Sequence, residues 1–262
     1  MLEIMLDAYP STRQWVLAIR GMRNPYKSWA KSDSCVDVVF TLGDKDLKLA
    51  KNLIKSGPEH AKFLRQLPVI FEIKAPMYWW KQMDQYKVGT TTDSESTMHK
   101  LVDKEFSPDD FSFEAMDLWE GLTASVNDVE AIDLSAECPS HGDLFLTGRR
   151  FYGCDLVFVI TDILNAYRNR YLECVEDGNT DGAKLFFNRI NELLPQSYNQ
   201  TRTWSANYAV LFNICAQRAG HKLEEWEDFI EYVLNNAPYF KTLCFDKLCQ
   251  ISPAFNKRFN ED

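Results

Sequence analysis

Three features of the sequence predict a helix-rich α+β protein. Apolar residues recur at helical spacing over several long segments, whereas only a few short runs rich in β-branched residues are typical of strands. The chain of 262 residues fits one large domain or two small ones and can bury a substantial core. No internal repeat or low-complexity tract is visible in it. Of the two arrangements we expect a single domain over residues 1–262, in which the acidic residues around 103–141 are a candidate insertion.

The N-terminal half is predicted to alternate short strands with helices. Ser11 or Thr12 is a suitable N-cap for the first helix, because a hydroxyl oxygen accepts from the free N–H groups of a first turn. Gly57 and Pro58 end the second helix. The expected strands are residues 2–8, 35–42 and 69–73, and the expected helices are residues 11–22, 44–56 and 77–86.

The C-terminal half is predicted to be mostly helical. A loop is expected before it, over residues 89–96, because glycine, threonine, aspartate and serine disfavour a regular helix. The first helix of this half has a basic C-terminal end, which is favourable for its dipole. The expected helices are residues 151–171, 182–194, 203–217 and 223–234.

Charge and hydropathy exclude several classes of function. The formal net charge of −9 argues against a general nucleic-acid surface, although a small anionic ligand needs only a few local cations. No apolar run approaches the roughly 20 residues of a membrane helix. Residues 1–15 carry acids early and lack the pattern of a signal peptide. We expect a cytoplasmic protein that binds neither nucleic acid nor membrane.

The cysteines give no indication of a metal site. There are seven, an odd number, and no two of them form a C-x-x-C pair. The four histidines are dispersed and form no H-x-x-x-H pair. We expect reduced thiols and no bound metal.

Residues 70–100 carry a dense set of candidate binding groups. An apolar run leads into the aromatic residues Tyr78, Trp79 and Trp80, and a polar run follows. One interpretation is a rigid buried element that delivers polar side chains to a pocket. A buried strand and helix followed by a surface loop has the same pattern. The polar candidates are Gln82, Gln85, Tyr86, Lys87, Ser94, Ser96, Thr97 and His99.

These groups suit a phosphorylated ligand, but not through a standard phosphate-binding motif. Lys87 can hold a phosphate as a point charge, Tyr86 can stack or donate a hydrogen bond, and His99 can act as acid, base or phosphate donor. The same groups also fit a solvated helix end and a surface loop. Neither G-x-x-x-x-G-K-[ST] nor G-x-G-x-x-G is present, so a P-loop and a Rossmann site are unsupported.

A second set of polar residues lies in the expected helix at residues 203–217 and just beyond it. At helical spacing, Asn207 and Arg218 fall on one stripe, and Asn213 lies on a different side. Polar groups among apolar neighbours need partners. The segment therefore lies either between a cofactor and a substrate or at a wet subunit interface.

The two sets together resemble the flavin-dependent thymidylate synthases, the ThyX family. The resemblance covers roughly residues 45–100 and 185–240. That family has R-Q-x-x-R-H-R followed by N-E-x-S-x-R-Y, and Gln82 and Ser96 match these patterns. A Leu-Pro precedes a helix with two asparagines and an arginine, which correspond to Asn207, Asn213 and Arg218. His60 stands in a G-P-E-H context similar to the family's segment before its central strand.

This chain departs from the family at its charged signatures. Gln85, Tyr86 and Lys87 stand where the family has R-H-R, so only one cation remains, and the lost guanidinium forks suit phosphate and flavin. Met98 and His99 replace an Arg-Tyr pair.

The resemblance implies a helix-rich α+β fold with a small central, mostly antiparallel sheet, and a homotetramer that binds FAD and dUMP between subunits. Such enzymes use NADPH and methylenetetrahydrofolate to methylate dUMP. By resemblance the catalytic residues are Arg218 and Gln82. The substrate-binding residues are Arg218, Lys87, Ser94, Ser96, Thr97 and His99, and the cofactor-binding residues are Tyr86, Lys87, Asn207, Asn213 and His60. The alternative is a catalytically degenerate protein of the same fold that binds a nucleotide or acts as an oligomeric interaction module.

Overall fold

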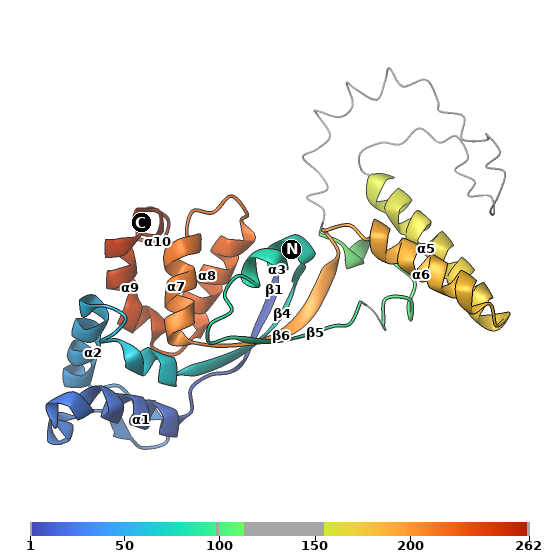
Figure 1. Ribbon diagram of the computed structural model, residues 1–262. Helices are drawn as coiled ribbons and strands as arrows, with labels where there is room; N and C mark the ends of the chain where they lie inside the picture. The colour runs from blue at the N-terminus through green and yellow to red at the C-terminus, as the bar shows by residue number, and fades with distance from the viewer. Residues whose placement is uncertain (1, 98–99, 113–154, 261–262) are drawn as a thin grey trace. The chain divides into compact units, whose positions relative to one another are not determined.

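The computed structural model describes residues 2–97, 100–112 and 155–260. They form two compact units, one of Met1–Ser94 with Gln200–Asp262 and one of Glu95–Asn199. The first unit combines helices with a four-stranded and a two-stranded sheet (Figure 1). The predicted helix-rich α+β class is confirmed. Residues 113–141 of the expected insertion lie outside the described residues, so the single-domain expectation stays a prediction.

The first unit holds most of the regular structure. Its strands are β1 (Glu3–Ala8), β2 (Cys35–Val36), β3 (Phe40–Thr41), β4 (Pro68–Pro76), β5 (Thr91–Ser94) and β6 (Asn199–Asn207). Its helices are α1 (Thr12–Arg23), α2 (Asp44–Ser56), α3 (Met77–Met83), α7 (Tyr208–Arg218), α8 (Glu225–Asn236), α9 (Phe240–Ile251) and α10 (Pro253–Phe259). Three short 3₁₀ helices are η1 (Asn24–Tyr26), η2 (Trp29–Lys31) and η3 (Lys62–Gln66).

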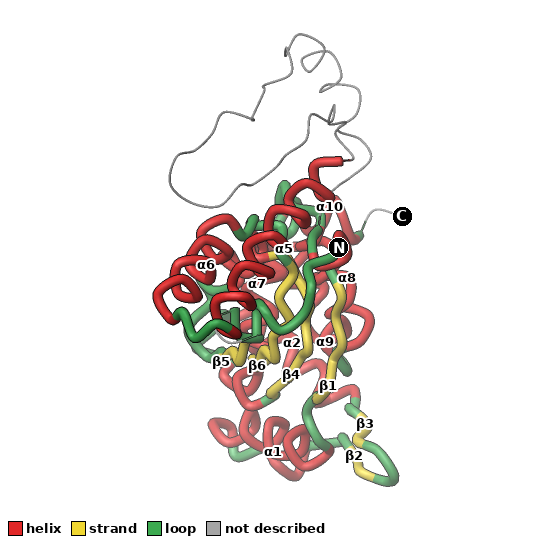
Figure 2. The backbone as a smooth tube through the Cα atoms, turned by 90° about the vertical axis from the view of Figure 1, so that its right-hand side faces the viewer, coloured by secondary structure: helices red, strands yellow, loops and turns green. Residues whose placement is uncertain are grey.

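The larger sheet has the strand order β1-β4-β6-β5 (Figure 2). Strand β1 pairs with β4 and β5 pairs with β6, both antiparallel. Burial alternates along β4, where Phe71 and Ile73 are buried and Glu72 is exposed. One face of the sheet is therefore covered, as is usual for antiparallel sheets.

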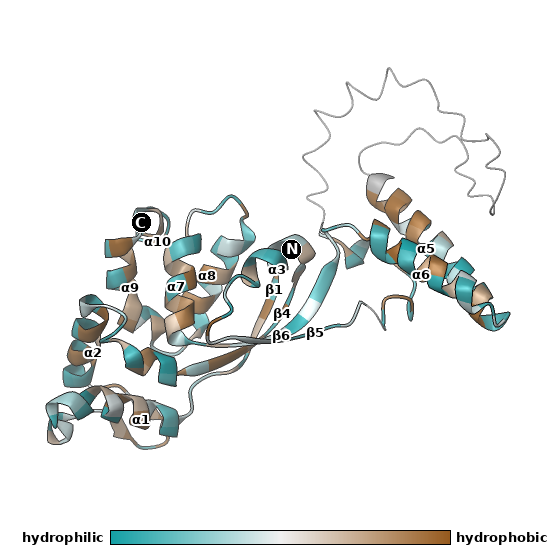
Figure 3. Ribbon diagram, viewed as in Figure 1, coloured by the Kyte–Doolittle hydropathy of each residue, from teal (hydrophilic) through white to brown (hydrophobic). Residues whose placement is uncertain are grey.

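Helices α7, α8 and α9 form the hydrophobic core with the covered face of this sheet. Each of these helices carries hydrophobic residues, as do β1 and β4 of the sheet (Figure 3). Phe229 of α8 packs against Phe71 and Trp204, with ring centroids 6.0 and 6.1 Å apart. Each fully buried ring of this size contributes about 1.5–3 kcal/mol.

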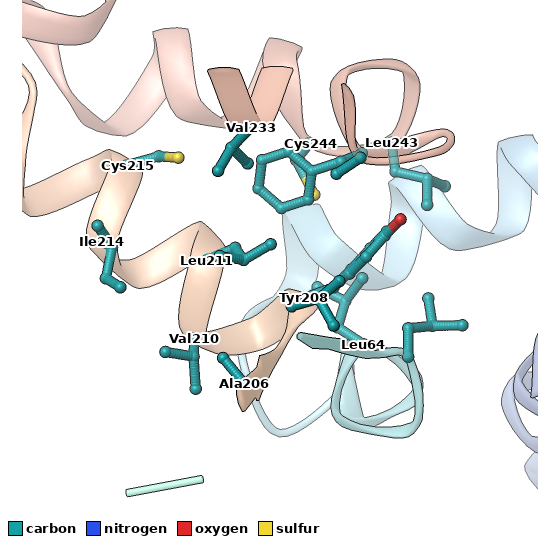
Figure 4. Close-up of a cluster of buried hydrophobic side chains, with 14 of the residues drawn as sticks. Leu64, Ala206, Tyr208, Val210, Leu211, Ile214, Cys215, Val233, Leu243 and Cys244 are labelled. Atoms are coloured by element: carbon teal, nitrogen blue, oxygen red, sulfur yellow. The ribbon is translucent and has the colours of Figure 1, made fainter. Parts of the chain in front are cut away.

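Tyr208 connects the sheet to the helices at the start of α7 (Figure 4). Its backbone N–H donates to the carbonyl of Leu67 at 3.0 Å, and its hydroxyl donates to the carbonyl of Pro238 at 2.6 Å. Cys215 and Cys244 lie in the same core, and burial raises the pKa of both thiols. The two groups are therefore packing residues rather than nucleophiles.

Two predicted elements differ from the structure because strand pairing decided them. The expected loop at residues 89–96 is wrong for its middle, which forms β5 through pairing with β6. The expected helix at residues 203–217 is wrong for its first part, because β6 continues to Asn207 and α7 begins at Tyr208. Strand β6 lies between β4 and β5 in the sheet, and both neighbours are more than 100 residues away in the sequence. Local propensity carries no information about such long-range pairing.

Other boundaries shift by smaller amounts. Residues 35–42 form two short paired strands rather than one, and α3 ends at Met83 rather than at residue 86. The first helix is confirmed, with Ser11 as its N-cap in a capping box with Gln14. Helices α9 and α10 had no counterpart in the sequence prediction.

The second unit is built on a helical hairpin of α5 (Asp155–Glu176) and α6 (Thr180–Leu193). The predicted basic C-terminal end of α5 is wrong, because the helix continues to Glu176 and its last turn has no basic residue. Asn165 of α5 binds both backbone groups of Phe106, at 2.8 and 2.9 Å. This amide holds residues 100–112, which include the 3₁₀ helix η4 (Pro108–Asp110), against the hairpin.

A buried ion pair fixes the end of α1 to the start of α2. Arg23 Nε donates to Asp46 Oδ1 at 2.5 Å, and both side chains are almost fully buried. The other carboxylate oxygen accepts from the hydroxyls of Ser32 and Ser34, both at 2.7 Å. Burial alone raises the pKa of Asp46, but the hydrogen bonds from Ser32, Ser34 and Arg23 outweigh it, and the pKa is lowered.

We predict that Asp46→Asn lowers the free energy of unfolding by about 3 kcal/mol, since it leaves the buried Arg23 cation without a counter-charge. Urea unfolding at pH 7 measures this. The folded-state pKa of Asp46 is lowered, so its contribution is present at neutral pH. It decreases as the pH falls below about 3.9, the ordinary aspartate value. The matched control is Asp246→Asn, which removes an exposed pair with Lys51 and should change stability by at most about 1 kcal/mol.

Candidate functional site

Polar side chains from two distant segments converge on Arg218, the last residue of α7. Arg218 Nε donates to Tyr86 Oη at 2.8 Å, Nη1 donates to Gln82 Oε1 at 3.2 Å, and Nη2 donates to Gln85 Oε1 at 3.1 Å. Trp226 Nε1 also donates to Gln82 Oε1, at 2.9 Å. We call these five residues the Arg218 cluster.

The guanidinium of Arg218 also lies over two aromatic rings. Its Cζ is 4.9 Å from the ring centroid of Trp226 and 5.4 Å from that of Tyr86. A cation over a ring face gains about 0.5–2 kcal/mol. Burial raises the pKa of Tyr86, while the hydrogen bond and charge of Arg218 lower it, and the net direction is upward. The phenol therefore stays protonated at neutral pH and accepts from Arg218 through its oxygen.

Helix α3 delivers the glutamines because its aromatic residues anchor it. Trp79 and Trp80 are fully buried. The ring of Trp79 lies 4.9 Å from that of Trp226, and Trp80 Nε1 donates to the carbonyl of Gln200 at 2.9 Å. The buried element is present, and its last turn presents Gln82 to Arg218. The loop after it is mostly exposed, as the alternative interpretation also expects, and delivery of polar side chains to a pocket stays a prediction.

The loop after α3 runs along α7. At one end, Tyr86 contacts Arg218. At the other, a Cβ on Gly89 would lie only 3.1 Å from Asn207 Nδ2, and Gly89 has a φ of +78°, which favours glycine. Lys87, an exposed cation, lies between these two contacts in the chain.

Asn207 caps α7 rather than lying within a helix. Its φ of −142° is extended, and its Oδ1 accepts from the backbone N–H groups of Ala209 and Val210 at 3.1 and 3.2 Å. The predicted helical stripe shared by Asn207 and Arg218 is therefore wrong. Asn213 is exposed on α7, and no hydrogen bond involves its side chain within the described residues.

The remaining predicted residues are dispersed. His60 is exposed after α2, and its backbone N–H donates to the carbonyl of Gly57. Its side chain makes no hydrogen bond to another described residue. Ser94 ends β5 opposite Arg202. Ser96 and Thr97 are half-buried in the second unit. His99 lies outside the described residues. The roles assigned to all these side chains stay predictions.

No metal cluster and no membrane helix occur in the described part of the chain. Its histidine, cysteine, aspartate and glutamate side chains form no group of three or more that could hold a metal ion. Among the same residues, no helix has both the length and the apolar character to cross a bilayer.

Comparison with known proteins identifies the fold. No protein-family model and no curated protein matches the sequence. ThyX from Helicobacter pylori, solved with FAD and dUMP, is 17% identical, with a TM-score of 0.57 over 95% of this chain and 99% of that one. This chain has the fold of the flavin-dependent thymidylate synthases. A second structure of the Helicobacter pylori enzyme, also with FAD and dUMP, gives 16% identity and a TM-score of 0.56, covering 93% and 98% of the two chains.

A further protein with this fold is a methylase of UMP and dUMP. The UMP/dUMP methylase PolB from Streptomyces cacaoi, bound with 5-Br dUMP, is 12% identical, with a TM-score of 0.52 over 99% of this chain and 95% of that one. The predicted ThyX-like fold is therefore confirmed, over nearly the full length of both chains.

The sequence analysis assigned no site role to two residues, Trp226 of the Arg218 cluster and His221 near it. Trp226 was assigned only to an amphipathic helix, where an apolar face is typical of core packing. His221 is half-buried, and its ring centroid lies 6.4 Å from that of Trp226. Burial, and next the charge of Arg218, lower the pKa of His221, so a neutral imidazole lies near the cluster. Neither residue has a local motif that reveals this position.

We predict that Gln82→Leu destabilises the protein by about 1–3 kcal/mol, because it removes the acceptor shared by Arg218 and the fully buried Trp226 and leaves the indole N–H unpaired. Thermal or urea unfolding measures the change. Gln85→Leu is the matched control, since Gln85 is exposed and its side-chain oxygen accepts, among the described residues, only from Arg218, and a smaller loss is expected. Equal losses for the two variants would contradict the role given to Trp226.

Proposed function

We propose that this chain binds a pyrimidine nucleoside monophosphate at the Arg218 cluster and acts as a divergent thymidylate synthase-like enzyme, on dUMP or a related nucleotide. The observation that carries the proposal is the convergence of two glutamines and a tyrosine on Arg218. It occurs in a fold whose solved examples were crystallised with dUMP or 5-Br dUMP.

The chemistry of the cluster suits the edge of a pyrimidine. A guanidinium has five N–H donors, and Arg218 uses three of them within the chain. The remaining donors and the amides of Gln82 and Gln85 complement a base edge that presents carbonyl oxygens and an N–H. Lys87 is an exposed cation next to the cluster and supplies a charge for the phosphate. By resemblance, Ser94 of the first unit is a further candidate for the phosphate, and the substrate-binding roles of Ser96, Thr97 and His99 stay predictions.

The groups along α7 also fit a flavin. Lys87 and Asn213 are exposed, and no described residue accepts from Nδ2 of Asn207. One cation and two amides are the kinds of group that bind a diphosphate and a polar ring system. We infer that Asn207, Asn213, Lys87 and Tyr86, with His60, hold FAD in a homotetramer. When bound, FAD supplies hydride transfer, and NADPH and methylenetetrahydrofolate are the co-substrates implied by the resemblance.

A second candidate is nucleotide binding without turnover. Two observations favour it: the Arg218 fork is already engaged by residues of its own chain, and Gln85-Tyr86-Lys87 stands in place of R-H-R. Each charge-assisted hydrogen bond lost with the missing arginines is worth about 1.5–3 kcal/mol. Flavin and substrate affinity therefore decrease unless other contacts replace these bonds.

We predict that dUMP raises the melting temperature of the wild-type protein and that Arg218→Ala removes most of this increase. Losing one or more hydrogen bonds to a charged group, at about 1.5–3 kcal/mol each, weakens binding about ten- to a hundredfold. The measurement is thermal shift, with each variant compared with itself with and without dUMP. Arg258→Ala, which removes an exposed pair with Glu227, is the control and should keep the full response. An unchanged response in Arg218→Ala would refute the site.

Absorbance separates the two candidates. Purified protein, scanned before and after incubation with excess FAD and desalting, should retain a flavin band if it is an enzyme of the ThyX type. Methylation of dUMP with NADPH and methylenetetrahydrofolate is then assayed. A colourless protein that still responds to dUMP supports nucleotide binding without turnover.

A further inference from the structure

A cavity in the first unit, formed by other residues than the Arg218 cluster, has the composition of a second ligand site. Its volume is about 350 Å³, and it lies between α1, η2 and β3. That volume is at the lower end for small-molecule sites, which are roughly 300–1,000 Å³, so it suits a single ring system rather than a dinucleotide. The lining residues used below are Ile19, Arg20, Arg23, Trp29, Ser32 and Phe40.

Two guanidinium groups line the cavity, and each has N–H donors without an acceptor among the described residues. Arg20 is exposed, and within the described ranges it makes no hydrogen bond or ion pair. Arg23 is only 4% exposed. Its Nε donates to Asp46 and its Nη1 to Ser28, while its Nη2 has no acceptor among the described residues. Arg23 lines the cavity, so this unpartnered donor is free to bind a ligand or water there.

Trp29 supplies a fixed aromatic surface. Its Nε1 donates to Asn24 Oδ1 at 2.8 Å, which holds the indole in place. The side chain is 46% exposed, and no other described ring stacks on it. An exposed indole face is a stacking surface for a planar ring, and Phe40 and Ile19 provide apolar contacts beside it.

The surrounding segment is strongly basic. Residues 12–31 contain five cations and no acid, although the whole chain has a net charge of −9. The cations are Arg13, Arg20, Arg23, Lys27 and Lys31. A local excess of positive charge raises the concentration of anions at this surface.

We propose that this cavity binds a small aromatic anion, a planar ring that carries one phosphate or carboxylate group. The ring stacks on Trp29, and the anionic group binds Arg20 and the Nη2 of Arg23. A nucleoside monophosphate and an aromatic acid share this chemistry. The site shares no residue with the proposed nucleotide site, so a negative result for one proposal does not contradict the other.

The test is isothermal titration calorimetry of the full chain with two probes, adenosine 5′-monophosphate and 2-naphthoate. We expect at least one probe to bind, and the stronger one identifies a phosphate or a carboxylate ligand. Arg20→Ala and Trp29→Ala should each weaken binding about tenfold or more, as expected for one charge-assisted hydrogen bond or one base-stacking contact. Both side chains are exposed, so both variants should fold.

Matched controls separate this site from other binding. Arg65→Ala, at another exposed arginine without a partner in the described structure, should bind as the wild type does. Arg218→Ala should also leave the affinity unchanged. Adenosine, which lacks the phosphate, should bind at least tenfold more weakly than its monophosphate if the nucleotide is the stronger probe. The proposal is overturned if neither probe binds, if Arg20→Ala and Trp29→Ala keep the wild-type affinity, or if Arg218→Ala abolishes binding.

Discussion

The guanidinium of Arg218 joins the consecutive helices α7 and α8 to α3, which lies far away in the sequence. Arg218 is the last residue of α7. Its guanidinium donates to Gln82 at the end of α3 and lies over the ring of Trp226 in α8. The tryptophan contact between Trp79 and Trp226 holds α3 and α8 together beneath it. A cation in this position needs acceptors and ring faces, and the glutamines and aromatic rings around it provide both. The position of every polar group in the cluster depends on this arrangement.

Arg218 is already hydrogen-bonded to its own chain, and this limits how a ligand can bind it. A nucleotide that binds here either uses the free N–H groups or exchanges with an internal acceptor. The internal bonds hold the guanidinium in one orientation before a ligand arrives, which lowers the entropy cost of binding. Exchange with Gln85 costs little, since that residue is exposed, whereas displacement of Gln82 also leaves the indole of Trp226 unpaired.

The two arginine sites of the first unit use different designs. Arg218 combines hydrogen bonds and ring faces in a half-buried position. Arg23 is buried and neutralised by Asp46, whose carboxylate accepts from two serines and two backbone N–H groups. The ion pair fixes the end of α1, and Arg20 and Trp29 therefore border a cavity with a rigid floor. A largely pre-formed pocket with apolar walls and a few polar groups is typical of a small-molecule site.

The sequence by itself determined the fold class, the buried aromatic residues after β4, and the residues Gln82, Tyr86 and Arg218 that meet in the cluster. These follow from local patterns and from a spacing that resembles ThyX. Only the tertiary structure decided that residues 203–207 form a strand and that Asn207 caps a helix, because pairing with β5 and β4 overrides the local helical pattern. It alone placed Trp226 beside Gln82, since a contact across 144 residues has no local signal.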